Sequence, residues 1–101
     1  MTFCLKTIII KPEKDIPINN AIILLHGYGG NGKDISMITL NWKRFLPNTI
    51  FLCPNAHEIC SINLNGFQWF DLTKKDPQYI LEQSMKAEKK LHQFIGEVKK
   101  E

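Results

Sequence analysis

The sequence predicts a single α/β domain, and three features indicate it. A chain of 101 residues is long enough for one domain and no more. Its composition, 44% hydrophobic and 23% charged, is that of an ordinary globular protein. Short apolar segments alternate with segments whose apolar residues recur at helical spacing. The order is strand, loop, strand, helix, strand, long loop, helix, which is typical of a mostly parallel sheet of about three strands with two main helices.

Three segments have the character of β-strands. Residues 3–10 are rich in β-branched side chains. Residues 21–25 form a continuous apolar run, which is expected of a strand that is covered on both faces. Residues 49–53 are mostly apolar and stop at a proline. The prolines, charges and Asn-Asn pair of residues 11–20 predict a surface connection between the first two strands.

Two segments have helical spacing. Residues 34–45 carry apolar side chains at steps of three and four, and Pro47 ends the segment. The second helix is expected to begin after Asp76, with Pro77 at its first position. Its predicted buried stripe consists of Ile80, Ser84, Ala87, Leu91, Ile95 and Val98. The aromatic-bearing residues 55–71 form a long loop, and such loops in compact domains are usually functional.

Charge, cysteine content and hydropathy exclude several classes of protein. The net charge of +3 is mild, and most lysines follow Thr73 in alternation with glutamates, which predicts a solvated helix face rather than a nucleic-acid surface. The three cysteines form no CxxC pair, and their odd number argues against a disulfide framework and for a reducing compartment. No secretory signal is visible, and no apolar run approaches the length of a membrane span. We therefore expect a cytoplasmic protein.

The segment that follows residue 25 reads His-Gly-Tyr-Gly-Gly-Asn-Gly-Lys-Asp and admits three interpretations. As G-x-G-x-x-G it matches a dinucleotide-binding turn, but no acidic residue follows the next strand to hold the ribose. As a P-loop it carries Asp34 where the hydroxyl that ligates Mg²⁺ is required. As a serine-hydrolase turn it would aim a backbone N–H at a developing oxyanion. Only this third interpretation uses His26, for which we expect a structural role.

Two blocks of the sequence resemble the phospholipase/carboxylesterase family, which includes acyl-protein thioesterases. LLHGYGGNGKDI looks like the HGxGxxGxD segment of that family, and CPNAHEICSINLNGFQWFDL looks like its second characteristic block. The matching residues of the second block are Pro54, Ala56, Glu58, Cys60, Gly66, Gln68, Trp69, Phe70 and Asp71. His57 departs from the pattern, because the family usually has proline there. The resemblance extends from about Ala21 to the last helix.

The resemblance implies that residues 1–101 are the N-terminal part of an α/β-hydrolase domain, with a partial α/β-hydrolase fold. The implied activity is that of a serine hydrolase of carboxylic esters or thioesters that needs no cofactor. Within this family pattern the Tyr28 N–H looks like one oxyanion donor, with Gly27 and Gly29 shaping the turn. Trp69 and Phe70 look like walls of an acyl pocket, although ordinary core or lid aromatics would account for them equally well.

The catalytic triad of such an enzyme is missing from this sequence. None of Ser36, Ser61 and Ser84 lies in a G-x-S-x-G elbow, and the histidine that follows them, His92, lies among lysines. We expect Asp71 to fix a loop, and we do not expect His57 to act as a base. In the family the elbow comes after a further strand, so we expect a downstream reading frame, in or out of phase, that encodes it.

Three classes of function therefore remain open at this point. The chain is a truncated serine hydrolase that is inactive alone, a non-enzymatic remnant or half of a split protein, or a nucleotide-binding protein. In the first two classes the strand that ends at His26 lacks a neighbour on one side. We expect this open edge to bind a complementary C-terminal half or to cause self-association. An acyl ester or thioester would be the substrate only of the completed protein.

Overall fold

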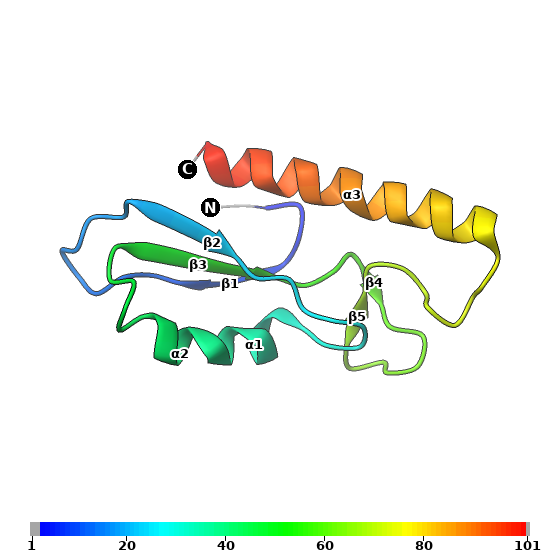
Figure 1. The fold of residues 1–101 in the computed structure, drawn as a ribbon, viewed down its shortest axis with the longest axis horizontal. Helices are drawn as coiled ribbons and strands as arrows, with labels where there is room; N and C mark the ends of the chain where they lie inside the picture. Colours follow the sequence, from blue (N-terminus) through cyan, green and yellow to red (C-terminus); the bar gives the residue numbers. More distant parts are fainter. Residues whose placement is uncertain (1–2, 101) are drawn as a thin grey trace.

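A three-stranded sheet lies between two helical layers in the computed structural model, which describes residues 3–100 (Figure 1). Its strands, in the spatial order β1-β3-β2, are β1 (Thr7–Ile10), β3 (Thr49–Pro54) and β2 (Asn20–Ile23). β3 is antiparallel to β1 and parallel to β2, so the sheet is mixed. The predicted α/β class, with three strands and two principal helical segments, is confirmed.

The helices cover opposite faces of the sheet (Figure 1). α3 (Pro77–Lys99) covers one face, and the segment made of α1 (Gly32–Ile35), a 3₁₀ turn and α2 (Thr39–Trp42) covers the other. Beyond the end of β3, the predicted long loop contains a short hairpin made of β4 (Glu58–Ile59) and β5 (Phe67–Gln68).

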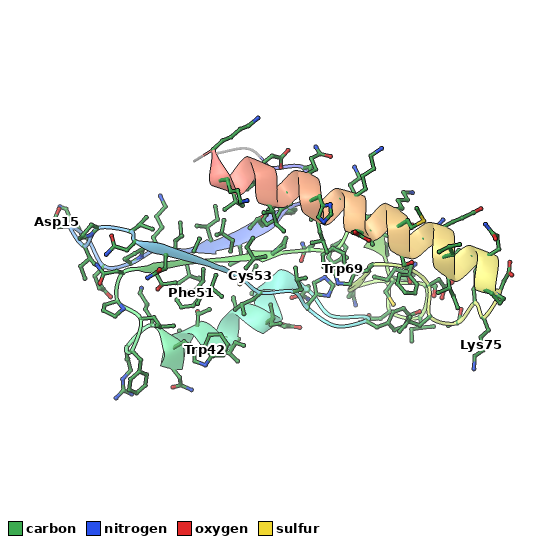
Figure 2. All side chains as sticks on the ribbon, turned by 45° about the horizontal axis from the view of Figure 1, so that its top comes forward. Asp15, Trp42, Phe51, Cys53, Trp69 and Lys75 are labelled. Carbon is green, nitrogen blue, oxygen red and sulfur yellow. The ribbon has the colours of Figure 1, made fainter. Side chains whose placement is uncertain are left out.

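β3 forms the centre of the core, because all six of its residues are buried. Ile50 and Leu52 point to the α3 side, where they pack in one cluster with Leu5 and Phe94. Phe51 points to the other side, where its ring lies 6.4 Å from that of Trp42 (Figure 2). This alternation follows from the two-residue period of a strand. The continuous apolar run of β3 is therefore explained by helices on both faces.

α3 begins as the sequence predicts, with the Asp76 side chain accepting a hydrogen bond from the N–H of Gln78. Its buried stripe differs from the predicted one. Phe94, which is not part of the predicted stripe, is fully buried, whereas Ile80 and Ile95 are 39% and 36% exposed. The first turns of α3, to which Ile80 belongs, extend past the end of the three-stranded sheet (Figure 1).

Two element boundaries also differ from the sequence prediction. The strand predicted over residues 3–10 begins only at Thr7, because the preceding residues turn toward α3, where the Cys4 N–H donates to Glu97 Oε1 at 2.8 Å. The helix predicted over residues 34–45 is interrupted by the 3₁₀ turn Ser36–Ile38. There the Ser36 and Thr39 hydroxyls donate to backbone carbonyls three residues earlier, at 2.6 and 2.7 Å. Such bonds compete with the regular helical pattern.

β2 lies at one edge of the sheet, because within residues 3–100 it pairs with β3 alone. Its side chains are less covered than those of β3, and Ile22 and Ile23 are only half-buried. Several large apolar side chains of the α1–α2 layer and of the hairpin loop are also exposed, namely Met37, Leu40, Phe45, Ile62 and Leu64. An unpaired strand edge beside exposed apolar residues is the usual setting for association with another chain segment.

Candidate functional site

The glycine-rich turn follows β2 directly and lies at the end of the sheet that the hairpin occupies (Figure 1). Gly29 has a φ of +79°, a conformation that side-chain-bearing residues rarely adopt. The N–H of Gly30 closes the turn by donating to the Gly27 carbonyl at 3.1 Å. The N–H of Tyr28, between them, has no hydrogen-bond partner within residues 3–100. It is therefore a free backbone donor on a tight turn.

The β4–β5 hairpin holds this turn in place. The Gly29 N–H donates to the Phe67 carbonyl, and the Phe67 N–H donates to the Gly30 carbonyl, both at 2.9 Å. The Asn63 side-chain amide adds a bond of 3.0 Å to the Gly29 carbonyl. A β-carbon on Gly66 would come within 2.0 Å of that same oxygen, so glycine is required where the two segments meet. The turn is thus held from one side by three hydrogen bonds, two from backbone N–H groups and one from a side-chain amide.

His26 links the turn to the end of β3. Its ring is buried, and Nε2 accepts a hydrogen bond from the Ala56 N–H at 2.9 Å. Nε2 therefore carries no proton, and Nδ1 carries one that it donates to the Gly27 carbonyl at 2.6 Å. Trp69 stacks on the imidazole at 5.4 Å and donates its Nε1–H to the His26 carbonyl at 3.1 Å. Both ring nitrogens are thus used in structural bonds, in agreement with the role expected for His26.

The Asp71 carboxylate accepts hydrogen bonds from three hydroxyl groups, including that of Tyr28. Its Oδ1 accepts hydrogen bonds from the Thr73 hydroxyl at 2.6 Å and the Thr73 N–H at 2.9 Å. The Ser61 and Tyr28 hydroxyls donate to the same oxygen at 3.0 and 3.2 Å. The Asp71 N–H in turn donates to the Tyr79 hydroxyl at 3.1 Å. The bonds from Thr73, foremost that of its hydroxyl, lower the pKa of Asp71 to about 2.

This depressed pKa predicts a pH dependence in acid. Asp71 stabilises the fold while it is ionised, so its contribution is complete above the ordinary carboxyl pKa and is lost as the pH falls toward about 2. Thr73→Ala should raise the pKa of Asp71 toward its ordinary value, whereas Thr73→Ser should keep it low. Titration of the Asp71 side-chain carboxyl carbon by NMR measures both. An unchanged pKa in Thr73→Ala would show that other donors control the carboxylate.

The serines and remaining histidines do not form a nucleophile–base pair within residues 3–100. Ser36 is buried and donates to the Lys33 carbonyl, and Ser84 donates to the Leu81 carbonyl. Ser61 is bound to Asp71 as described, with no histidine among its partners. His92 is largely exposed, 3.9 Å from Glu88. No serine is therefore activated by a neighbouring imidazole in the described chain.

The structure brings four of the predicted site residues together. Tyr28, Gly27 and Gly29 form the turn, and Trp69 packs directly behind it. Phe70 is half-buried next to Trp69 in the chain. The contacts of Trp69 with His26 are structural. The role of Trp69 as a wall of an acyl pocket stays a prediction.

Sequence reasoning missed several polar residues that position this turn: Asn55, Asn63, Thr73 and Tyr79. Each of them bonds a partner that lies elsewhere in the loop or in another element. The asparagines of the loop are themselves a signal, because asparagine side chains often bond loop backbone. Their specific partners depend on tertiary contacts that the sequence does not encode locally.

The contacts around α1 also bear on the nucleotide interpretations. α1 is four residues long, and its N-cap Asn31 accepts the Asp34 N–H at 2.7 Å. The Gly32 N–H donates to the Asn55 side chain at 2.7 Å. A phosphate-binding turn needs such N–H groups free to face the phosphate. Here both are already bound by asparagine oxygens, which disfavours nucleotide binding at this turn.

Over residues 3–100, no three His, Cys, Asp or Glu side chains are grouped so that they could bind a metal ion. None of the helices there combines the length and apolar character that crossing a membrane requires.

Comparisons with known proteins agree with this geometry. A profile of the phospholipase/carboxylesterase family matches residues 6–101. The structure resembles the crystal structure of esterase PE8 with a TM-score of 0.78 and 27% sequence identity. The match covers 93% of this chain but 44% of the esterase, so this chain spans less than half the length of that relative. The partial α/β-hydrolase fold is thereby confirmed, and the chain belongs to the phospholipase/carboxylesterase family.

Proposed function

We propose that this chain is the part of a serine ester or thioester hydrolase that carries one oxyanion donor and part of the acyl-binding wall. The free N–H of Tyr28 is the observation that carries the proposal. Oxyanion stabilisation needs a backbone donor that is rigid before the reaction and has no competing protein acceptor. The clamp formed by Asn63, Phe67 and Gly66 supplies that rigidity. Trp69 and Phe70 are proposed to contact the acyl group.

The nucleophile, the acid and the base are proposed to come from a further segment. A strand carrying the nucleophile would pair with the open edge of β2, which brings its elbow next to the Tyr28 turn. The half-buried Ile22 and Ile23 would then be covered on both sides. By itself the chain is expected to hydrolyse p-nitrophenyl esters no faster than free imidazole at equal concentration, because its histidines are not coupled to a serine.

Ester hydrolysis by the completed protein tests the proposal. The chain is joined to, or co-expressed with, the segment encoded after it, and hydrolysis and labelling by a fluorophosphonate probe are measured. Tyr28→Pro removes the proposed donor and should lower kcat about 10²–10³-fold. Tyr28→Phe keeps the N–H and is the matched control, which should retain most of the activity. Equal kcat in Tyr28→Pro and Tyr28→Phe would contradict the assigned donor.

Association of the isolated chain provides a second measurement. Without a covering segment, β2 should drive self-association, so sedimentation should show species larger than a monomer that increase with concentration. A compact monomer that melts cooperatively above about 65 °C would argue against an incomplete sheet. Absence of esterase activity after completion would instead favour a non-enzymatic binding role for the family fold.

A further inference from the structure

A cavity of about 500 Å³ lies beside the chain that leads into β1, and none of its lining residues belongs to the glycine-rich turn itself. It is bounded by the chain that leads into β1, by the end of β3 with the residues after it, and by α3. Its lining residues include Leu5, Ala56 and Phe67, which give it an apolar wall. The cavity is separate from the open edge of β2, because β1 and β2 lie at opposite edges of the sheet.

His57 lines this cavity and is left without a structural partner. Its side chain is 9% exposed, and neither ring nitrogen has a hydrogen-bond partner within residues 3–100. The nearest acidic group, the Glu58 carboxylate, is 3.7 Å from Nε2, beyond hydrogen-bond distance. Buried polar groups are nearly always bonded, so an unbonded imidazole in a cavity wall indicates a ligand-binding group. Burial lowers the pKa of His57, which keeps it neutral with one N–H to donate.

Besides the neutral Asn55 and Cys4, the other polar side chains that line the cavity are cationic. Lys6, Lys86 and Lys90 line it together with His57, and Lys86 and Lys90 lie close enough to His57 to lower its pKa further. Burial raises the pKa of the Cys4 thiol, which is therefore neutral at pH 7. The lining carries three lysines and no carboxylate, while Glu58 beside His57 and Glu97 on the Cys4 N–H lie just outside it. That positively charged lining matches a dianion better than a monoanion.

We infer that this cavity binds a small organic phosphate monoester. The phosphate dianion would pair with Lys86 and Lys90 and accept the His57 N–H, while the apolar part of the ligand would contact Phe67 and Leu5. The ring nitrogens are shielded from solvent, so the side chains that cover them must move to let the phosphate reach them. Binding at this site does not require the proposed hydrolase function, because every lining residue belongs to the present chain. The site adjoins the Tyr28 turn through Phe67, whose backbone bonds Gly29 and Gly30.

Titration of the chain with phenyl phosphate, followed by the NMR signals of the histidine rings, tests the inference. The His57 signals should shift saturably with a Kd of about 1 mM or tighter, and its pKa should rise in the complex. The exposed His92 serves as an internal reference. Inorganic phosphate should bind more weakly than phenyl phosphate because it lacks the apolar part, and benzoate should bind more weakly because it is a monoanion.

Variants of α3 that each remove one lysine charge distinguish binding in this cavity from non-specific attraction of phenyl phosphate to the basic helix. Lys86→Gln and Lys90→Gln should each weaken phenyl phosphate binding about fivefold. Lys89→Gln removes the same charge one position away from the lining and should change the Kd by less than about twofold. His57→Phe should weaken binding about tenfold. Thermal melts should show no loss of stability in that variant, because it removes an unbonded polar group.

Three outcomes would overturn the inference. The first is no saturable His57 shift at about 10 mM phenyl phosphate. The second is an equal loss of affinity in Lys89→Gln and Lys86→Gln, which would indicate attraction to the whole helix. The third is benzoate binding as tightly as phenyl phosphate, which would contradict the dianion. If His57→Phe fails to fold, the comparison of Lys86→Gln and Lys90→Gln with Lys89→Gln still tests whether phenyl phosphate binds in the cavity.

Discussion

Gly32→Ala should strongly destabilise the chain. A β-carbon at this position would lie 2.1 Å from the Cys53 carbonyl oxygen in the buried strand β3. The obstacle is backbone rather than a flexible side chain, so α1 must move away from the sheet. That movement would also break the 2.7 Å bond from the Gly32 N–H to Asn55 Oδ1. We expect a loss of about 3 kcal/mol or more, a large part of the ~5–15 kcal/mol available to a small domain.

The helical Gly96→Ala is the matched control for this prediction. A β-carbon at Gly96 would meet nothing within 4 Å, so no steric penalty opposes the substitution. Alanine also favours the helix by about 0.5–1 kcal/mol over glycine. Chemical denaturation of both variants should therefore shift the midpoint in opposite directions. A normal midpoint for Gly32→Ala would mean that α1 does not pack on β3 as described.

Phe94→Ala should cost about 3–5 kcal/mol of folding free energy. The side chain is fully buried and joins α3 to the sheet through Leu5, Ile50 and Leu52. Its ring also contacts that of Phe3 edge to face at 5.2 Å. Removal leaves a cavity in the cluster where α3 and the residues that precede β1 meet the strands. For a domain of this size the melting temperature should fall by about 12 °C or more.

Phe45→Ala provides the corresponding surface control. Phe45 is 78% exposed, so its truncation should change stability by no more than about 0.5 kcal/mol. Calorimetry of both variants, in the presence of any segment needed to keep the chain monomeric, measures the difference. Similar melting temperatures for the two variants would show that α3 is not anchored through Phe94.

Local patterns in the sequence were sufficient for the classes of most elements and for the position of the turn. The run 49–53 is a buried strand, and Asp76 with Pro77 begins the last helix. These features depend on side-chain chemistry within a few residues: apolar continuity, capping and proline geometry. The two family blocks identified the chain for the same reason, because glycines and aromatic residues at fixed spacing are local properties of the chain.

Tertiary structure alone decided which residues those elements bury and how the turn is held. Periodicity placed Ile80 and Ile95 in the stripe of α3, but the sheet lies under Phe94, and the first turns of the helix extend past it. The hydroxyl donors of Asp71 come from three separate segments of the chain. The surroundings of His57 also depend on residues that are distant in the sequence, because Lys86 of α3 lines the same cavity. Packing between residues distant in the sequence determines which side chains are buried and which polar groups are bonded. Local sequence patterns therefore do not predict either one.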